Sequence, residues 1–344
     1  MHRHGARPVR RRGRRGRVRR LIADLHLDVL LDVFERRAAG DADPFGERHL
    51  PALREAGVRI QVLPAFVPDE FLPGDALRVT IAQLEVAHRE AERPDGALRI
   101  VRDRAELREA LESGAIAGVL ALEGVEALGD DPELLRPLHR LGVRMAGLTW
   151  NRANAYADGL GVEVSTGLTA LGERLLGEME ELAIGLDISH LSRRGCERAL
   201  DAFGGTVLAS HANAAAVHAS PRNLDDDVLA AIGRRGGVVG LCATPAFTGT
   251  GPFAEMLARH HAHICAVAGV EAVAFGADFC DFFGPSLEAP LLPDPPGEAD
   301  LALARQPEPE RATFYAEVLS AAGEPDGGPL AAGNALRVLD RVLA

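Results

Sequence analysis

A chain of 344 residues is long enough to bury one large hydrophobic core, or two modest ones, without the help of disulfides. Hydrophobic residues make up 47% of the sequence and the mean hydropathy is near zero, which is typical of a soluble globular protein. No apolar run approaches the roughly 20 residues that a membrane helix needs, so a membrane partner is not expected.

The charged residues are unevenly distributed along the chain. Residues 1–20 contain ten Arg and no acidic residue, Lys is absent throughout, and the rest of the chain carries 28 Arg against 50 acidic residues, a formal charge of −22. The basic segment could be a nucleic-acid-binding arm or a targeting segment, but it lacks the apolar stretch of a signal peptide. We therefore predict a disordered extension, or a translation start assigned too far upstream. The acidic remainder argues against a nucleic-acid partner.

Four cysteines, Cys196, Cys242, Cys265 and Cys280, are widely spaced and include no C-x-x-C pair. This spacing indicates reduced thiols rather than a disulfide framework or a zinc knuckle. A reducing compartment follows from that interpretation, so we predict a cytoplasmic protein.

After residue 20 the sequence alternates between short apolar runs and longer segments with helical apolar spacing. The eight predicted strands lie at 21–28, 58–65, 116–122, 143–148, 185–188, 206–209, 237–242 and 272–275. The predicted helices lie at 48–56, 75–92, 105–111, 132–141, 168–183, 193–203, 225–235, 253–268, 308–321 and 330–343. Residues 151–167 are predicted to form a polar loop and residues 285–297 a proline-rich loop.

This alternation predicts a fold of the α/β class. Strands separated by helices run parallel and are joined by right-handed crossovers. Eight of them in about 250 residues favour a (β/α)8 barrel of the TIM type over a doubly wound sheet. We therefore predict one barrel domain over residues 21–344, with the last two helices packed outside the barrel.

Asp24, His26 and Asp28 close the first predicted strand. Because side chains alternate along a strand, we expect all three to share one face. The neighbouring Leu25 and Leu27 argue that this stretch is buried, where two carboxylates and an imidazole would be costly without a partner. A divalent metal would be such a partner. The alternative is a surface strand with a solvated polar face.

Polar residues also follow four of the other predicted strands, at the end where a barrel of this kind carries its chemistry. They are Glu123, Asp187, Ser189, His190, Ser210, His211 and Asp278. Taken singly, each has a structural explanation as a helix N-cap, a turn residue or part of a surface loop. Five equivalent strand ends together indicate one site. Its oxygen and nitrogen donors, with no Cys among them, suit a pair of zinc-type ions in a hydrolase.

With these residues in place, the sequence resembles the membrane (renal) dipeptidases and their bacterial relatives, peptidase family M19. The matching segments occur in family order and span the chain from about residue 22 to residue 340. They are Asp24-Leu-His26-Leu-Asp28, Leu122-Glu123-Gly124, Asp187-Ile-Ser-His190, Ser210-His211-Ala-Asn, Ala219-Ser-Pro-Arg222-Asn223-Leu-Asp225-Asp226, Gly276-Ala-Asp278-Phe279 and Gly333-Asn334-Ala-Leu-Arg337.

The resemblance implies a (β/α)8 barrel that holds two zinc ions, or other divalent metals. His26 and Asp28 would bind one ion, His190 and His211 the other, and the catalytic residue Glu123 would bridge them. A hydroxide between the metals would then cleave the amide bond of dipeptides, including those with a C-terminal D-residue.

The resemblance also implies roles around the metals. Asp24 would orient His26 from behind, and Asp278 would be the catalytic proton-handling acid. Arg222 would grip the substrate carboxylate, although a salt bridge to Asp225 or Asp226 at a helix start is the alternative for that side chain.

Trp150 departs from the family pattern, because the characterised dipeptidases carry a histidine there that contacts the substrate. Trp150 and the adjacent Asn151 are expected to line the substrate site, but an indole offers only one N–H donor. The aromatic residues that the dipeptidases place after the strand at 237–242 are also not evident. Two alternatives therefore stay open: an amidohydrolase acting on another small amide or N-acyl amino acid, and an inactive metal-binding paralogue. A small peptide is the expected partner, and a homodimer is an open alternative to a monomer.

His260 and His263 share one predicted helix at a spacing that could bind a metal. We expect a solvated helix face there instead.

Overall fold

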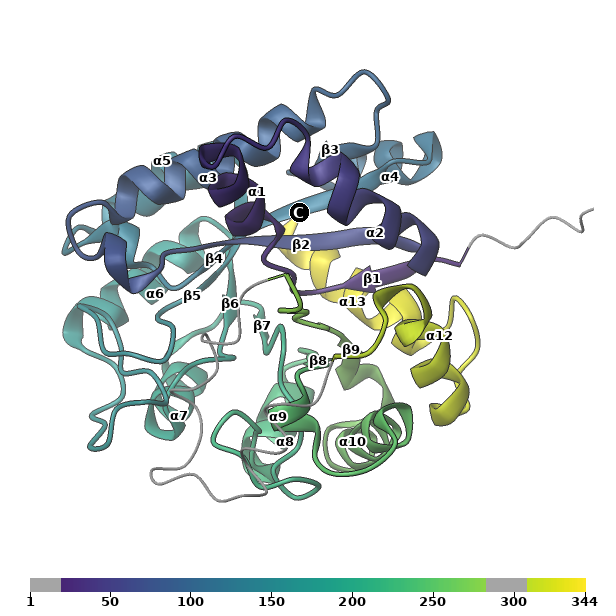
Figure 1. Ribbon diagram of the computed structural model, residues 1–344. Helices are drawn as coiled ribbons and strands as arrows, with labels where there is room; N and C mark the ends of the chain where they lie inside the picture. The colour runs from purple at the N-terminus through teal and green to yellow at the C-terminus, as the bar shows by residue number, and fades with distance from the viewer. Residues whose placement is uncertain (1–19, 283–307) are drawn as a thin grey trace, which may run out of the picture.

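The computed structural model describes residues 20–282 and 308–344 (Figure 1). The predicted basic extension, apart from Arg20, and the predicted proline-rich loop at 285–297 lie outside the described residues. In the described part of the chain, no helix combines the length and apolar character needed to cross a bilayer.

The centre of the fold is a nearly closed barrel of eight parallel strands. In sheet order they are β7 (Val207–Leu208), β6 (Gly185–Asp187), β5 (Val143–Gly147), β4 (Ile116–Glu123), β2 (Val58–Phe66), β1 (Ile22–Asp24), β9 (Val273–Phe275) and β8 (Val239–Leu241). A parallel bridge between Ala209 and Val239 joins the two ends of this order. The predicted barrel and its eight strands are confirmed. The short strand β3 (Leu98–Ile100), which pairs with β4 outside the ring, was not predicted.

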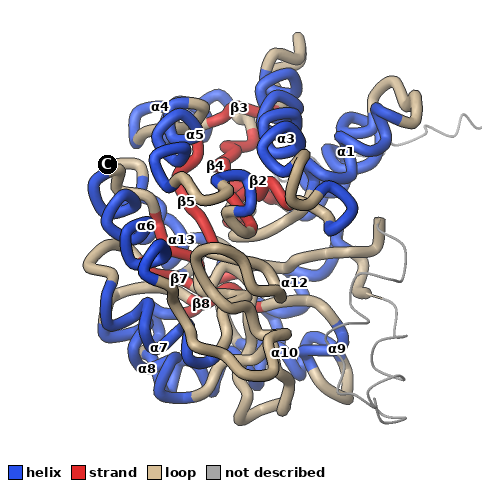
Figure 2. The backbone as a smooth tube through the Cα atoms, turned by 90° about the vertical axis from the view of Figure 1, so that its left-hand side faces the viewer, coloured by secondary structure: helices blue, strands red, loops and turns tan. Residues whose placement is uncertain are grey.

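Helices surround the strands, as Figure 2 shows. They are α1 (Val29–Ala38), α2 (Leu50–Ala56), α3 (Ala76–Ala91), α4 (Arg104–Ser113), α5 (Leu135–Arg140), α6 (Ala170–Glu181), α7 (Arg193–Ala202), α8 (Asp226–Arg234), α9 (Pro245–Thr248), α10 (Phe253–Ala268), α12 (Arg311–Ala322) and α13 (Asn334–Val342). Several begin where a side chain caps free backbone N–H groups: Asp103 accepts from Ala105 and Glu106, and Ser192 accepts from Gly195.

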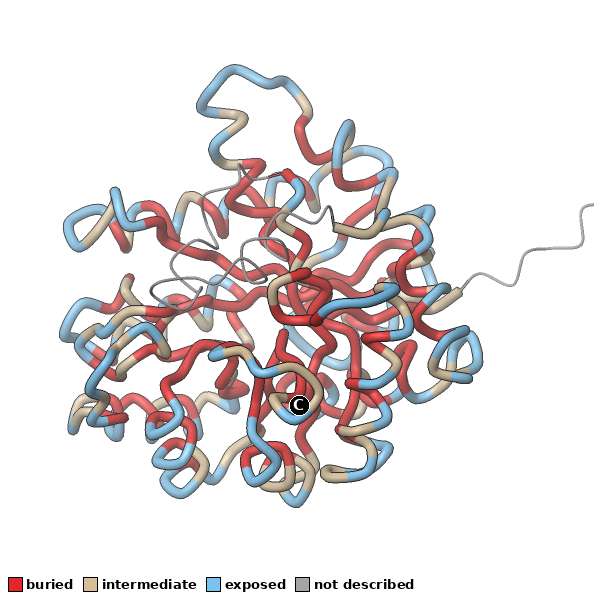
Figure 3. Tube along the Cα trace, turned by 60° about the horizontal axis from the view of Figure 1, so that its bottom comes forward, coloured by how far each residue is buried: buried red, intermediate tan, exposed pale blue. Residues whose placement is uncertain are grey.

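Strand β4 shows how the sequence sorts its side chains. Ala117, Val119 and Ala121 belong to the cluster that fills the barrel, whereas the alternate residues Ile116 and Leu120 pack in the larger cluster beneath the helices. Both sets are buried, as the red centre of Figure 3 shows, which is why the strand reads as one continuous apolar run. Glu123, at the end of this strand, continues the inward series and so enters the mouth of the barrel.

Helix α13 corrects the prediction that both C-terminal helices pack outside the barrel. Helix α12 does lie against the outer helices α2 and α10. In contrast, Ala335, Val338, Leu339 and Val342 of α13 join the cluster that fills the barrel. Its side chains also bond the backbone before β8 and β9, because Arg337 donates to the carbonyls of Gly236 and Glu271. The helix therefore covers the amino-terminal end of the barrel and packs against its inward residues.

The first strand is shorter than predicted. It ends at Asp24, and α1 begins at Val29. The Asp24 carboxylate accepts a hydrogen bond of 3.0 Å from the backbone N–H of His26, two residues further along, and this contact turns the chain out of the strand. Strand alternation does not apply beyond Asp24, so the expectation that Asp24, His26 and Asp28 share a strand face is wrong.

Candidate active site

The predicted metal ligands meet at the carboxyl ends of the barrel strands. His26 and Asp28 follow β1, His190 follows β6 and His211 follows β7, while Glu123 is the last residue of β4. All five side chains are buried. Asp278, which follows β9, joins them.

The Glu123 carboxylate lies between imidazoles from two sides. Its Oε1 is 2.8 Å from Nε2 of His190 and 3.7 Å from Nε2 of His211. Its Oε2 is 3.6 Å from Nε2 of His26. One carboxylate thus presents each of its oxygens to a different half of the cluster, which is the arrangement that a bridging ligand needs.

Asp278 and Asp28 complete the cluster on the His26 side. Nε2 of His26 is 3.8 Å from Oδ2 of Asp28 and 3.8 Å from Oδ1 of Asp278. The other Asp278 oxygen is 4.0 Å from Nε2 of His211. Among the described residues there are three overlapping groups of possible metal ligands, and one of them is His26, Asp187 and His211. The other two contain Glu123 or Asp278. They are Glu123, His190 and His211 in one group, and His26, Asp28 and Asp278 in the other.

The chemistry of this cluster fits divalent cations. Burial raises the pKa of Glu123 to about 7, and the nearby Asp28 charge adds to that effect. Burial raises the pKa of Asp278 well above its usual range, and it lowers the pKa values of His190 and His211. Within the described residues, His26 Nε2 and Asp28 Oδ1 are buried without a hydrogen-bond partner. Burial alone would lower the pKa of His26 as well, but the adjacent Glu123 and Asp28 carboxylates raise it well above its usual value. Imidazoles and crowded carboxylates are ligands that zinc-type ions accept.

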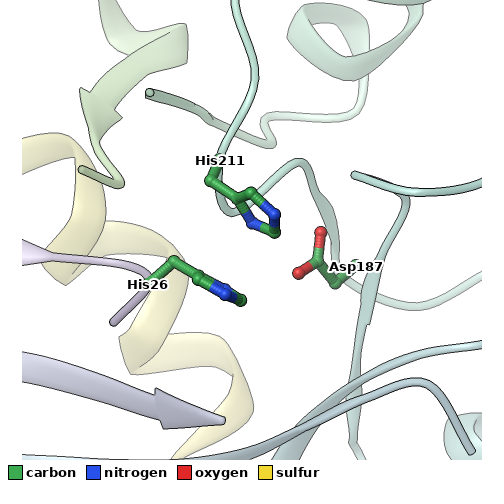
Figure 4. A group of neighbouring side chains, drawn as sticks. All are labelled: His26, Asp187 and His211. Atoms are coloured by element: carbon green, nitrogen blue, oxygen red, sulfur yellow. The ribbon is translucent and has the colours of Figure 1, made fainter. Parts of the chain in front are cut away.

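Asp187 has a structural role that the sequence did not reveal. Figure 4 shows its carboxylate pointing toward the rings of His26 and His211. It accepts hydrogen bonds from the backbone N–H and hydroxyl groups of both Ser189 and Ser210. The Ser210 hydroxyl in turn lies 2.7 Å from Nδ1 of His211 and 3.3 Å from Nδ1 of His26. Asp187 and Ser210 thereby orient the His26 and His211 rings from the Nδ1 side, which faces away from Glu123.

Asp24 supports His26 through the backbone rather than through the ring. Its carboxylate accepts from the His26 N–H, from Nε2 of Gln61, from the Ala277 N–H and from the Tyr315 hydroxyl. Burial raises the pKa of Asp24, and these four donors oppose that rise. The carboxylate thus joins the ends of β1 and β9 to helix α12.

Arg222 lies within the cluster and is 2% exposed. Its guanidinium donates to the carbonyls of Ser189 and His211, and one of its nitrogens is 3.3 Å from Nε2 of His190. The alternative salt bridges of Arg222 are not formed, because Asp225 pairs with Arg193 and Asp226 pairs with His263.

Asn151 and Trp150 both lie beside His190. Oδ1 of Asn151 is 2.8 Å from Nδ1 of His190, so this amide orients the imidazole. The Trp150 ring lies 5.9 Å from the His190 ring and 5.3 Å from that of Phe66, a residue that the sequence did not single out. Phe66 lies beside Trp150 because β2 contacts the loop after β5. This contact between distant segments cannot be predicted from a local sequence pattern.

Asp278 adopts an uncommon backbone conformation, with a φ of 52°. Its N–H donates to the His26 carbonyl at 3.1 Å, and the thiols of Cys242 and Cys280 lie 4.0 and 3.9 Å from its two carboxylate oxygens. Aspartate tolerates this left-handed region better than most residues. The turn directs the carboxylate into the cluster.

An α/β barrel with such a cluster at the carboxyl ends of its strands is the architecture of metal-dependent hydrolases. The membrane dipeptidase family, peptidase family M19, matches residues 11–289, and the chain belongs to this family. The predicted family relationship is thereby confirmed.

Individual relatives agree with this assignment. Dipeptidase verJ of Clonostachys rogersoniana is 33% identical over 208 residues, which cover 60% of this chain and 54% of that protein. The chain thus spans about half the length of this curated relative. Two crystal structures superpose on this chain with a TM-score of 0.76 and 26% sequence identity. The first is a dipeptidase of family M19, and the match covers 94% of this chain and 99% of that chain. The second is a metallopeptidase from Rhodobacter sphaeroides bound to a phosphinate mimic of the dipeptide L-Ala-D-Ala, and the match covers 93% of this chain and 99% of that chain.

Proposed function

We propose that the protein is a dipeptidase that uses two divalent metal ions, zinc in the first instance, in a single domain over residues 21–344. His26 and Asp28 would hold one ion, His190 and His211 the other, and Glu123 would bridge them. The observation that carries the proposal is the position of Glu123, whose two oxygens face His190 and His26 respectively. When bound, such a metal pair polarises a scissile carbonyl and makes water a nucleophile at neutral pH.

The residues around the ligands have roles in the same reaction. Asp278 takes the proton of the attacking water and delivers it to the leaving amine, for which a buried and basic carboxylate is suited. Arg222 binds the substrate's C-terminal carboxylate, because its planar fork matches that group and its Nε has no hydrogen-bond partner among the described residues. Asn151 positions His190, while Asp24, Asp187 and Ser210 keep the other imidazoles in place.

The preferred substrates are dipeptides, including those with a C-terminal D-residue. The relative from Rhodobacter sphaeroides, crystallised with a mimic of L-Ala-D-Ala, supports their inclusion. Trp150 favours a second candidate function, because an indole replaces the polar contact that a histidine would give. In that case the same machinery hydrolyses another small amide or an N-acyl amino acid.

A hydrolysis screen tests the proposal. Zinc- and cobalt-loaded protein is assayed against L,L-dipeptides, L,D-dipeptides and N-acyl amino acids. Cleavage of dipeptides supports the dipeptidase. Cleavage of N-acyl amino acids alone contradicts it and supports the second candidate, and no cleavage of any class with two metals bound indicates an inactive metal-binding paralogue.

We also propose a cytoplasmic location. Cys196, Cys242 and Cys265 are free thiols, and the first two of them are buried. Such thiols are typical of a reducing compartment. Whether the chain forms a homodimer stays a prediction that size measurement in solution would test.

A further inference from the structure

Two aromatic side chains and a guanidinium pack together beside His190. Phe66 ends β2, and Trp150 and Arg152 belong to the loop that follows β5. The Phe66 and Trp150 rings are 5.3 Å apart and inclined at 60°. The Arg152 guanidinium lies 5.8 Å from the centre of the Phe66 ring and 5.5 Å from that of the Trp150 ring. These three residues are called the Trp150 wall below.

Arg152 is held from several sides, and this keeps the wall in place. It donates to the Val67 carbonyl at 2.9 Å and forms ion pairs with Asp69 and with the buried Glu126. Its side chain is only 20% exposed. A planar cation fixed in this way packs on both aromatic faces and limits the rotation of Trp150. These contacts therefore hold the Trp150 wall in one arrangement.

The position of the wall relates it to the reacting centre. The Trp150 ring centre is 5.9 Å from that of His190, and the Nε2 atom of His190 faces Glu123 at 2.8 Å. Arg222 approaches the same Nε2 atom to 3.3 Å. A molecule bound at the cluster therefore lies within reach of both the guanidinium of Arg222 and the indole of Trp150.

The chemistry of the wall is apolar. Phe66 contributes no polar group, Trp150 contributes a single N–H, and the Arg152 charge is directed to its carboxylate partners. A large apolar substrate side chain that contacts these residues is stabilised by the burial of its apolar area. A small side chain buries little area, and a polar one loses its hydration.

We propose that the Trp150 wall determines side-chain specificity, so that the enzyme prefers dipeptides with a large apolar residue at one of their two positions. The inference rests on the proposed dipeptidase function and adds to it the class of dipeptide. Trp150 and Phe66 are the residues that contact the substrate side chain, and Arg152 positions them.

Two dipeptide series test this with the full chain loaded with zinc. The series are X-Ala and Ala-X, where X is Gly, Ser, Leu or Phe. We expect kcat/KM to rise roughly tenfold or more from Gly and Ser to Leu and Phe in one series, since each methylene in an apolar pocket changes selectivity to about that extent. Trp150→Ala should remove most of that rise and leave the metal content unchanged. The control is Val164→Ala, in the same loop at a side chain that is 82% exposed, and it should keep the rise.

A binding measurement gives a second readout that needs no turnover. Trp150 is the only tryptophan in the chain, so its fluorescence reports on the wall directly. Titration with the phosphinate analogue of the preferred dipeptide should shift the emission and saturate at a concentration at least tenfold lower than the Gly-containing analogue requires. A wall that only packs against His190 would show no such difference.

The outcomes separate the inference from the function on which it rests. Dipeptide cleavage with equal kcat/KM across both series, or with a preference that survives Trp150→Ala, overturns the specificity role and leaves the dipeptidase intact. If neither series is cleaved, the dipeptidase proposal fails and the specificity proposal falls with it.

Discussion

The Tyr315 hydroxyl donates a hydrogen bond of 2.8 Å to Oδ2 of Asp24, and so connects helix α12 to the first strand of the barrel across 291 residues of sequence. Tyr315→Phe removes this one donor and leaves the buried Asp24 carboxylate with three others. We expect a loss of about 1.5–3 kcal/mol in the free energy of unfolding, as for a hydrogen bond to a charged group. Denaturant titration with zinc removed measures it.

Tyr156 offers a matched control for that variant. It is also fully buried, but its hydroxyl has no hydrogen-bond partner within the described residues. Tyr156→Phe should therefore leave the stability unchanged or raise it slightly, because no bond is lost. Equal losses from the two variants would show that the Tyr315 bond contributes nothing beyond ring packing.

Glu123→Gln should lower the metal content below the two ions per chain that we propose. The amide keeps one acceptor oxygen but cannot present two anionic oxygens to the two halves of the cluster. Elemental analysis after dialysis against a weak chelator measures the stoichiometry. His263→Gln is the control, since His263 pairs with Asp226 on the surface and should not affect metal binding. A wild-type protein that binds no metal even with added zinc would exclude the metal proposal.

Asp278→Asn should lower kcat by roughly 10²–10⁴-fold while the metal content stays the same, because an amide cannot accept the proton of the attacking water. Steady-state rates and elemental analysis on the same preparation test both parts. Asp281→Asn is a suitable comparison: Asp281 lies three residues away, half-exposed, and pairs with Arg311. An unchanged rate in Asp278→Asn would mean that this carboxylate transfers no proton.

Arg222→Lys should raise KM for dipeptides more than it lowers kcat. A lysine ammonium is a point charge, and it cannot both reproduce the two backbone bonds of Arg222 and grip a carboxylate with two parallel donors. The split between KM and kcat distinguishes this role from a structural one. Arg193→Lys, at a surface ion pair with Asp225, should change neither constant.

The barrel could be predicted from the sequence because its strands are buried on both faces. Runs such as Ile116–Glu123 have no polar face, so they could be recognised from composition alone. The end of β1 could not be recognised, because it depends on the hydrogen bond from the His26 N–H to the Asp24 carboxylate. Helix α1 was not predicted, because its apolar first residues continue the apolar run of the preceding strand. Helix α13 packs where it does because the amino-terminal end of the barrel is open, and this opening cannot be predicted from the local sequence pattern.

The candidate site divides in the same way. His26 was recognisable because it lies at the end of a predicted strand, and Glu123, His190 and His211 because they follow predicted strands. Strand ends share one edge of a parallel barrel. Phe66 was not recognisable, because its contact with Trp150 joins elements more than 80 residues apart. The roles of Asp187 and Ser210 depend on hydrogen-bond geometry, whereas the sequence shows only that polar residues are present.

His260 was expected on a solvated helix face, and this expectation is wrong. The ring is fully buried between the loop after β7 and the end of α9. Its Nδ1 accepts a hydrogen bond of 3.1 Å from the Ala214 N–H, and its Nε2 lies 3.0 Å from the Thr248 carbonyl. The Ala214 N–H requires an unprotonated Nδ1, so the ring is neutral in the folded state. Burial lowers the pKa of His260 to about 4.

This neutral histidine predicts a pH dependence of stability. Between the ordinary histidine pKa of about 6.5 and the folded value of about 4, the unfolded chain binds a proton at His260 and the folded chain does not. The contribution of neutral His260 to the free energy of unfolding is therefore complete above pH 6.5, and it is lost as the pH falls through this window. For one group the loss reaches up to about 3 kcal/mol at pH 4.

His260→Gln isolates this contribution, because glutamine can accept and donate hydrogen bonds but does not titrate in this range. The variant should be less stable than the wild type at pH 7.5, and the difference should shrink as the pH is lowered to 4.5. Denaturant titrations of zinc-free protein at four or five pH values measure it, which keeps proton competition at the metal ligands out of the comparison. A wild type and a His260→Gln variant with the same pH dependence would show that the proton is accepted in the folded state.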